Sequence, residues 1–166
     1  MRELVEPGLR YRESWRAAHA EWGAGLHEDG FGLWATDDVA TDQGFAAWLA
    51  RLHGRSDRAT FFWIVERDEV QGGIVLRHHG DDHAGHIGYG IRPSARGRGL
   101  ASWALGQVLL TARMRGMTAV EIVCEDDNTA SAAVIVRNGG RLVSVEREGE
   151  HLLRRYRIDL ASDEDE

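Results

Sequence analysis

A turn rich in glycine and arginine is the part of this chain best suited to chemistry. An apolar run ending at Ile91 leads into Arg96-Gly97-Arg98-Gly99-Leu100-Ala101, which opens a long amphipathic segment. Glycines at a helix start let the backbone approach a ligand closely, and first-turn amides have no partner within the helix. Those amides and the helix dipole favour an anion, and the arginines add charge and forked donors. The segment therefore predicts a binding site for phosphate or diphosphate.

Other phosphate-binding patterns fit this turn less well. The dinucleotide pattern needs a third glycine where Ser102 stands, and no acidic residue follows at the expected distance. The chain has no Gly-Lys-Ser/Thr, which excludes a nucleoside triphosphatase loop. A single Arg-Gly-Arg-Gly in an acidic chain is weak evidence for RNA binding. The structural alternative, a tight turn that only begins a helix, stays open.

Composition limits the partners of the chain. Its 166 residues carry a formal net charge of -7, and Asp163-Glu164-Asp165-Glu166 form an acidic tail that we expect to be disordered. All 20 basic residues are arginines. A nucleic-acid binder normally shows a basic surface, so we expect no nucleic-acid partner. No apolar run is long enough to cross a membrane and no secretory segment begins the chain, so we expect no membrane contact.

Cysteine and histidine usage argues against a disulfide and a metal site. Cys124 is the only cysteine and stands in an apolar run, so we interpret it as a core residue. This favours a reducing, cytoplasmic location. His78-His79 and His83-x-x-His86 lack a helical frame and a third ligand, so we expect no metal.

Hydrophobic periodicity predicts an α/β protein in which hairpins precede βαβ units. We expect helices at Arg10–His27, with Trp15 and Trp22 on its apolar face, and at Gln43–Leu52, capped by Thr41-Asp42. The region 29–42 is expected to be a loop. The other expected strands and helices are Leu4–Gly8, Phe61–Val65, Gly73–Leu76, Gly85–Arg92, Leu100–Arg115, Ala119–Cys124, Thr129–Arg137, Arg141–Arg147 and Leu152–Leu160.

The glycine turn also resembles a known family. Arg96-x-x-Gly99-x-Ala101 is similar to the Arg/Gln-x-x-Gly-x-Gly/Ala signature of the GNAT superfamily of acetyl-CoA-dependent N-acetyltransferases. A second block agrees, since Asn128-x-x-Ser131 opens a predicted helix that closes at Asn138-Gly139-Gly140, as in a bacterial subgroup of predicted acetyltransferases. The resemblance covers about Phe61 to Leu160 and implies a single GNAT domain over residues 1–160. Its fold would be a central mixed sheet of about seven strands flanked by about four helices, with residues 161–166 as the tail.

The resemblance implies acetyl-CoA as co-substrate and no metal. In relatives the signature holds the diphosphate mainly through backbone amides, the preceding strand pairs with pantetheine, and the second block flanks its arm. The implied cofactor-binding residues here are Ile91, Arg96, Gly97, Arg98, Gly99, Leu100, Ala101, Asn128 and Ser131.

The implied reaction needs a base, an oxyanion donor and a departing thiolate. Gly88 and Gly90 suit a strand bulge whose backbone N–H groups stabilise the oxyanion. His86 is our candidate general base. Ile135 stands where many relatives carry a tyrosine acid, so Tyr89 is our catalytic candidate. The alternatives are Tyr156 as acid and Glu66, Glu121 or Glu125 as base.

The resulting hypothesis is an N-acetyltransferase that acts by direct attack in a ternary complex. Its acceptor would be a primary amine of a small molecule or peptide, with Trp34 and His27 as candidate contacts or core residues. The missing helix tyrosine leaves a non-catalytic acyl-CoA sensor as the alternative. A homodimer is a further expectation, because dimers are common among relatives.

Overall fold

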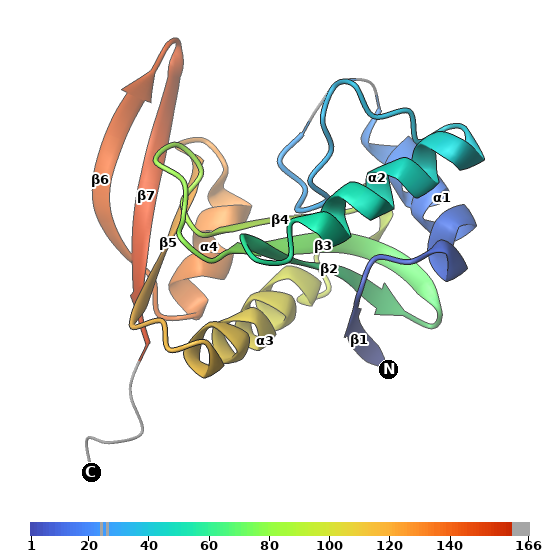
Figure 1. The fold of residues 1–166 in the computed structure, drawn as a ribbon. Helices are drawn as coiled ribbons and strands as arrows, with labels where there is room; N and C mark the ends of the chain where they lie inside the picture. Colours follow the sequence, from blue (N-terminus) through green and yellow to red (C-terminus); the bar gives the residue numbers. More distant parts are fainter. Residues whose placement is uncertain (24, 26, 161–166) are drawn as a thin grey trace. The chain divides into compact units, whose positions relative to one another are not determined.

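The computed structural model describes residues 1–23, 25 and 27–160 (Figure 1). That part of the chain contains seven strands and four α-helices, which confirms the predicted α/β class. In chain order they are β1 (Arg2–Val5), α1 (Arg12–Trp22), α2 (Asp42–Gly54), β2 (Ala59–Glu66), β3 (Glu69–Arg77), β4 (Ile87–Ile91), α3 (Leu100–Met114), β5 (Ala119–Glu125), α4 (Thr129–Arg137), β6 (Arg141–Glu148) and β7 (His151–Asp159). Short 3-10 helices occupy Leu9–Tyr11 and Pro93–Ala95.

The strands form two sheets where the sequence predicted one central sheet. One sheet has the order β1-β2-β3-β4 and the other β5-β7-β6. Strand β5 pairs with β7 along its whole length. On its other side, the pairing described for β5 is an isolated bridge between Ile122 and Gly85. One bridge is too short to make a ladder, and this divides the strands between two sheets.

The chain divides into two compact units. The first contains Met1–Val75 and Tyr89–Leu100, and the second contains Leu76–Gly88 and the chain from Ala101 onward. We describe each unit by itself. The predicted disordered tail at residues 161–166 lies outside the described residues.

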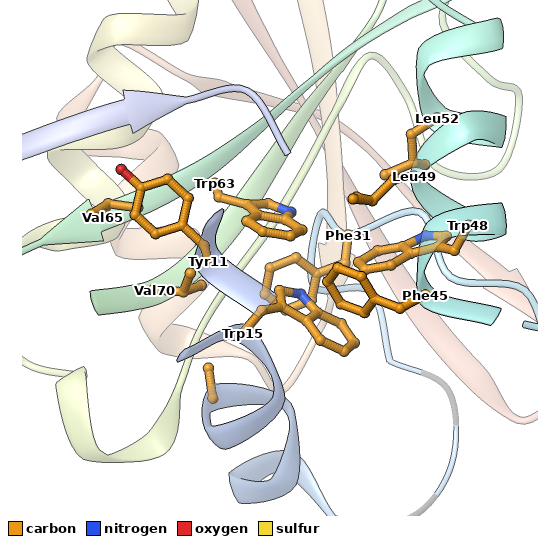
Figure 2. Close-up of a cluster of buried hydrophobic side chains, with 11 residues drawn as sticks. Tyr11, Trp15, Phe31, Phe45, Trp48, Leu49, Leu52, Trp63, Val65 and Val70 are labelled. Carbon is orange, nitrogen blue, oxygen red and sulfur yellow. The ribbon is translucent and has the colours of Figure 1, made fainter. Parts of the chain in front are cut away.

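An aromatic cluster forms the core of the first unit, and Trp15 of α1 lies at its centre (Figure 2). The Trp15 ring centroid lies 4.6 Å from that of Trp48 and 5.6 Å from that of Phe45, both on α2. Phe31 of the α1–α2 loop and Trp63 of β2 complete the contacts at 5.5 and 6.2 Å. All five side chains are essentially buried. The helical spacing of the aromatic residues therefore did identify the buried faces of α1 and α2.

Several predicted boundaries in this unit were wrong, among them those of α1 and β1. Helix α1 ends at Trp22 and not at His27, because Gly23 takes a positive φ of 83° that breaks the helix. Strand β1 runs from Arg2 to Val5, where it pairs with β2 from Glu66 to Trp63, and does not extend to Gly8. Thr41 caps α2 as predicted, since its hydroxyl accepts a hydrogen bond from the amide of Gly44.

The second unit contains the β5-β7-β6 sheet, α4 and nearly all of α3. Helix α4 has the predicted limits, Thr129–Arg137. Asn138 fastens its end to the first turn of α3, because Nδ2 donates to the carbonyls of Ser102 and Val134 at 3.3 and 2.9 Å. Ile135 of α4 is fully buried. Strand β6 lies next to β7 and forms the edge of its sheet (Figure 1).

Among the described residues, no helix combines the length and apolar character that crossing a membrane requires.

Candidate functional site

The predicted anion-binding turn forms an open loop between β4 and α3, which we call the glycine loop (residues 92–99). Its backbone has positive φ at Gly97 and Gly99, 80° and 77°, a conformation that side-chain-bearing residues rarely adopt. A Cβ atom built on either glycine would meet no other atom within 4 Å. Glycine is therefore required here by backbone conformation, and the space beside it is free of protein.

The backbone amides at the end of the glycine loop are available to a ligand. The amides of Ser94, Ala95 and Arg96 all donate within the protein. Of the hydrogen bonds among described residues, none uses the amides of residues 97–100. Because α3 begins at Leu100, these donors lie at the positive end of a 15-residue helix. The arrangement suits a phosphate or diphosphate group.

The two arginines of the signature hold the loop and do not point their donors only at solvent. Arg96 Nε donates to the carbonyl oxygen of Ile91 at 2.9 Å. Arg98 pairs with Glu66 of β2 at 2.6 Å, and its carbonyl oxygen accepts from Arg2 at 2.8 Å. The hydrogen bond from Arg98 lowers the pKa of Glu66. These contacts give both side chains a structural role in holding the loop.

Glu21, near the end of α1, anchors the start of the glycine loop and was not predicted from the sequence. Its carboxylate forms an ion pair with Arg92 and accepts from the amide and hydroxyl of Ser94 at 2.9 and 3.0 Å. Hydrogen bonding to Arg92 is the main cause that lowers the pKa of Glu21 to about 2. More than seventy residues separate the partners in the chain, so local spacing carries no signal for this contact.

The loop between α1 and α2 packs its backbone directly on glycines of β3 and β4. A Cβ on Gly90 would lie 2.8 Å from Cα of Asp29, and one on Gly73 would lie 3.0 Å from the carbonyl oxygen of Asp29. The close approach of this loop is a reason for glycine at position 90. The strand bulge that we predicted there stays a prediction. The contact buries Asp29, a carboxylate that our sequence analysis assigned only to a loop.

His86 does not present a free nitrogen to act as base. Its Nδ1 accepts the amide N–H of Glu121 at 2.9 Å, and its own amide donates to the carbonyl of Glu121 at 2.7 Å. Burial lowers the pKa of His86, so the ring is neutral near pH 7 and carries its proton on Nε2. The geometry favours a structural role that ties the segment before β4 to β5.

The carboxylates considered as alternative bases each lie beside a basic side chain. Glu66 pairs with Arg98, Glu121 with Arg155 at 2.9 Å and Glu125 with His151 at 3.5 Å. Of the two candidate acids, Tyr156 is buried in β7, whereas Tyr89 is half-buried in β4 beside Gly90. Tyr89 therefore remains the better candidate for a proton donor.

The second block has a local structural role in the second unit. Asn128 caps α4, because its side-chain oxygen accepts from the amide of Ser131 at 3.0 Å. This explains the three-residue spacing between Asn128 and Ser131.

Cys124 is buried in β5, and burial raises the pKa of its thiol, which agrees with the predicted core role.

Trp34 and His27, the predicted acceptor contacts, are both exposed and not part of the aromatic core. The Arg51 guanidinium lies 3.7 Å from the Trp34 ring centroid and also pairs with Asp37. Within residues 1–23, 25 and 27–160, no cluster of three or more His, Cys, Asp or Glu side chains could hold a metal ion.

Comparison with known proteins bears on the family and the fold of the chain. Residues 13–141 match the family model of the acetyltransferase (GNAT) domain. No curated protein matches the chain significantly.

Solved structures of acetyltransferases share the fold at low sequence identity. One is RimL, the ribosomal L7/L12 alpha-N-protein acetyltransferase, in complex with coenzyme A. The sequence identity is 21%, the alignment covers 96% of this chain and 94% of RimL, and the TM-score is 0.72. A second is the microcin C7 self-immunity acetyltransferase MccE in complex with acetyl-CoA and AMP. The sequence identity is 17%, the alignment covers 95% of this chain and 92% of MccE, and the TM-score is 0.73. A third, from Salmonella typhimurium, modifies the N-terminal serine of ribosomal protein L7/L12. The sequence identity is 21%, the alignment covers 96% of this chain and 95% of that chain, and the TM-score is 0.71.

Proposed function

The chain belongs to the GNAT acetyltransferase family, and from that premise we propose that it transfers the acetyl group of acetyl-CoA to a primary amine by direct attack in a ternary complex. The observation that carries the proposal is the set of amides at residues 97–100, which no described hydrogen bond uses, beside two glycines with positive φ and open space. Support also comes from similar structures that hold coenzyme A or acetyl-CoA.

In this proposal the end of the glycine loop and the first turn of α3 bind the cofactor. Backbone amides of Gly97, Arg98, Gly99, Leu100 and Ala101 hold the diphosphate, while the side chains of Arg96 and Arg98 keep the loop in shape. Glu21 fixes the loop where it leaves β4. Acetyl-CoA supplies an activated thioester, and holding it beside the amine turns a two-body encounter into a local one.

The remaining site residues are assigned by their position in the family's pattern. The main chain at Ile91 pairs with pantetheine, and Asn128 and Ser131 flank its arm. Tyr89 donates a proton to the departing thiolate. We leave His86 out as base, because its Nδ1 is already an acceptor and its Nε2 carries the proton. The single domain over residues 1–160, the cytoplasmic location and the homodimer stay predictions from the sequence.

A non-catalytic acyl-CoA sensor is the second candidate, favoured by buried Ile135 at the position of the usual tyrosine. An amine panel separates the two functions. The full chain is mixed with acetyl-CoA and spermidine, an aminoglycoside, a free amino acid or a serine-initiated peptide, and released thiol is measured. We expect thiol release that depends on one of the amines. Tight binding of acetyl-CoA without amine-dependent release would support the sensor, and absence of coenzyme A binding would refute both functions.

A further inference from the structure

Two carboxylates from distant parts of the chain hold the two ends of the glycine loop. At its start, Glu21 of α1 pairs with Arg92 and accepts hydrogen bonds from the amide and the hydroxyl of Ser94 at 2.9 and 3.0 Å. At its end, Glu66 of β2 pairs with Arg98 at 2.6 Å. Both contacts lie within the first unit. The loop that offers amides to an anion is therefore fixed on both sides by acids.

Acids are not expected beside an anion-binding loop. A carboxylate repels a phosphate group, and the last turn of a helix, where Glu21 lies, disfavours a negative charge. Each acid nevertheless belongs to a network and not to a single ion pair. Glu66 also accepts from Arg2 Nε at 3.3 Å, and Arg2 donates to the carbonyl oxygen of Arg98 at 2.8 Å. Arg92 also donates to a backbone carbonyl of β3 at 3.2 Å. The networks tie the loop to α1, β1, β2 and β3.

Both acids are ionised at neutral pH. Hydrogen bonding to Arg92 is the main cause that lowers the pKa of Glu21 to about 2, and the hydrogen bond from Arg98 lowers the pKa of Glu66. The Arg92 side chain is 13% exposed and that of Glu66 is 14% exposed, so each pair has one partner largely removed from water. Each arginine is thus neutralised by an acid, and what the two pairs provide is a fixed position for the loop backbone.

Resting on the proposed binding of coenzyme A at this loop, we propose that Glu21 and Glu66 are positioning residues, which hold the amides of residues 97–100 in the arrangement that a diphosphate needs. Gly97 and Gly99 make this backbone segment flexible unless other contacts hold it. A loop that is already ordered loses less conformational entropy when its ligand binds. The two carboxylates therefore raise the affinity for coenzyme A, although their charge has the same sign as that of its diphosphate.

The sign of the effect separates positioning from simple electrostatics. If charge alone mattered, Glu21→Gln and Glu66→Gln would bind coenzyme A more tightly than wild type, because each removes a negative charge and releases an arginine. Positioning predicts the opposite. We expect each variant to bind coenzyme A about tenfold more weakly in calorimetric titration. On the best amine of the panel, KM for acetyl-CoA should rise while kcat stays within about twofold of wild type, because the acids act on binding alone.

A matched control and a double variant complete the test. Glu13→Gln removes an acid of the same helix that pairs with Arg12 and Arg16 and has no described contact with the glycine loop. Its affinity for coenzyme A should equal that of wild type. Because Glu21 and Glu66 hold one loop, release of either end should loosen the same amides. The double variant should therefore lose less affinity than the product of the two single losses, less than about 100-fold.

Two results would overturn the positioning role while leaving the proposed function intact. One is an affinity for coenzyme A in Glu21→Gln and Glu66→Gln that equals or exceeds that of wild type. The other comes from the wild-type chain without ligand and does not depend on the folding of a variant. NMR order parameters of the amides of residues 97–100 should be about 0.85, as in rigid backbone, and values below about 0.6 would refute the role. If wild type does not bind coenzyme A, the proposed function fails, and the positioning role fails with it.

Discussion

Replacing Asp29 by asparagine should make the protein more stable at neutral and alkaline pH. Burial raises the pKa of Asp29 from 3.8 to about 6, so between these values the folded protein binds more protons than the unfolded chain. Stability therefore falls as the pH rises from about 4 through about 6 and is constant above that. Each pH unit between the two pKa values is worth about 1.36 kcal/mol. The ionised carboxylate should thus lower the free energy of unfolding by about 3 kcal/mol at pH 8.

Denaturant unfolding at about pH 4 and about pH 8 measures this difference. Asparagine keeps the acceptor for the Phe31 amide, so the variant should equal wild type near pH 4 and exceed it by up to about 3 kcal/mol near pH 8. Glu28→Gln, which changes an exposed neighbour, should show a much smaller gain. A variant that is equally stable or less stable at pH 8 would refute the reasoning.

Two further predictions concern packing and hydrogen bonding within each unit. Trp15→Ala should lower the free energy of unfolding by about 3–5 kcal/mol, because it empties the centre of the aromatic cluster in Figure 2, and calorimetric melting checks it. Asn138→Ala removes the donor to Ser102 and Val134 and should cost about 1–2 kcal/mol in denaturant unfolding; an unchanged midpoint would contradict the proposed link between α4 and α3.

Regular periodicity and local capping made much of the fold predictable. Helix α4 was located to the residue, because Asn128 at one end and Asn138-Gly139-Gly140 at the other are strong local signals. The apolar faces of α1 and α2 followed from aromatic spacing. The end of α1 could not be predicted in this way, because the apolar pattern continues beyond Gly23. The backbone φ of Gly23 shows that the helix stops there.

The candidate site was predictable in its backbone and much less so in its side chains. Glycines near the start of a helix predict, from the sequence alone, a turn with free backbone amides. The structure has such a turn, with positive φ at Gly97 and Gly99. Glu21 and Asp29 were missed because their partners lie far along the chain. His86 illustrates the converse: its residue type suggested a base, whereas its hydrogen bond to Glu121 determines which nitrogen holds the proton.

The proposed function depends on the amides of the glycine loop, which would bind the diphosphate of coenzyme A. A comparison of Gly99→Val with Gly116→Val isolates this binding, because both glycines have a φ near 80° and a Cβ on either meets no atom within 4 Å. Both variants should lose similar stability, about 1–2 kcal/mol. Calorimetric titration with coenzyme A should show affinity reduced by about tenfold or more in Gly99→Val and unchanged in Gly116→Val. Equal affinity in the two variants would contradict the claim.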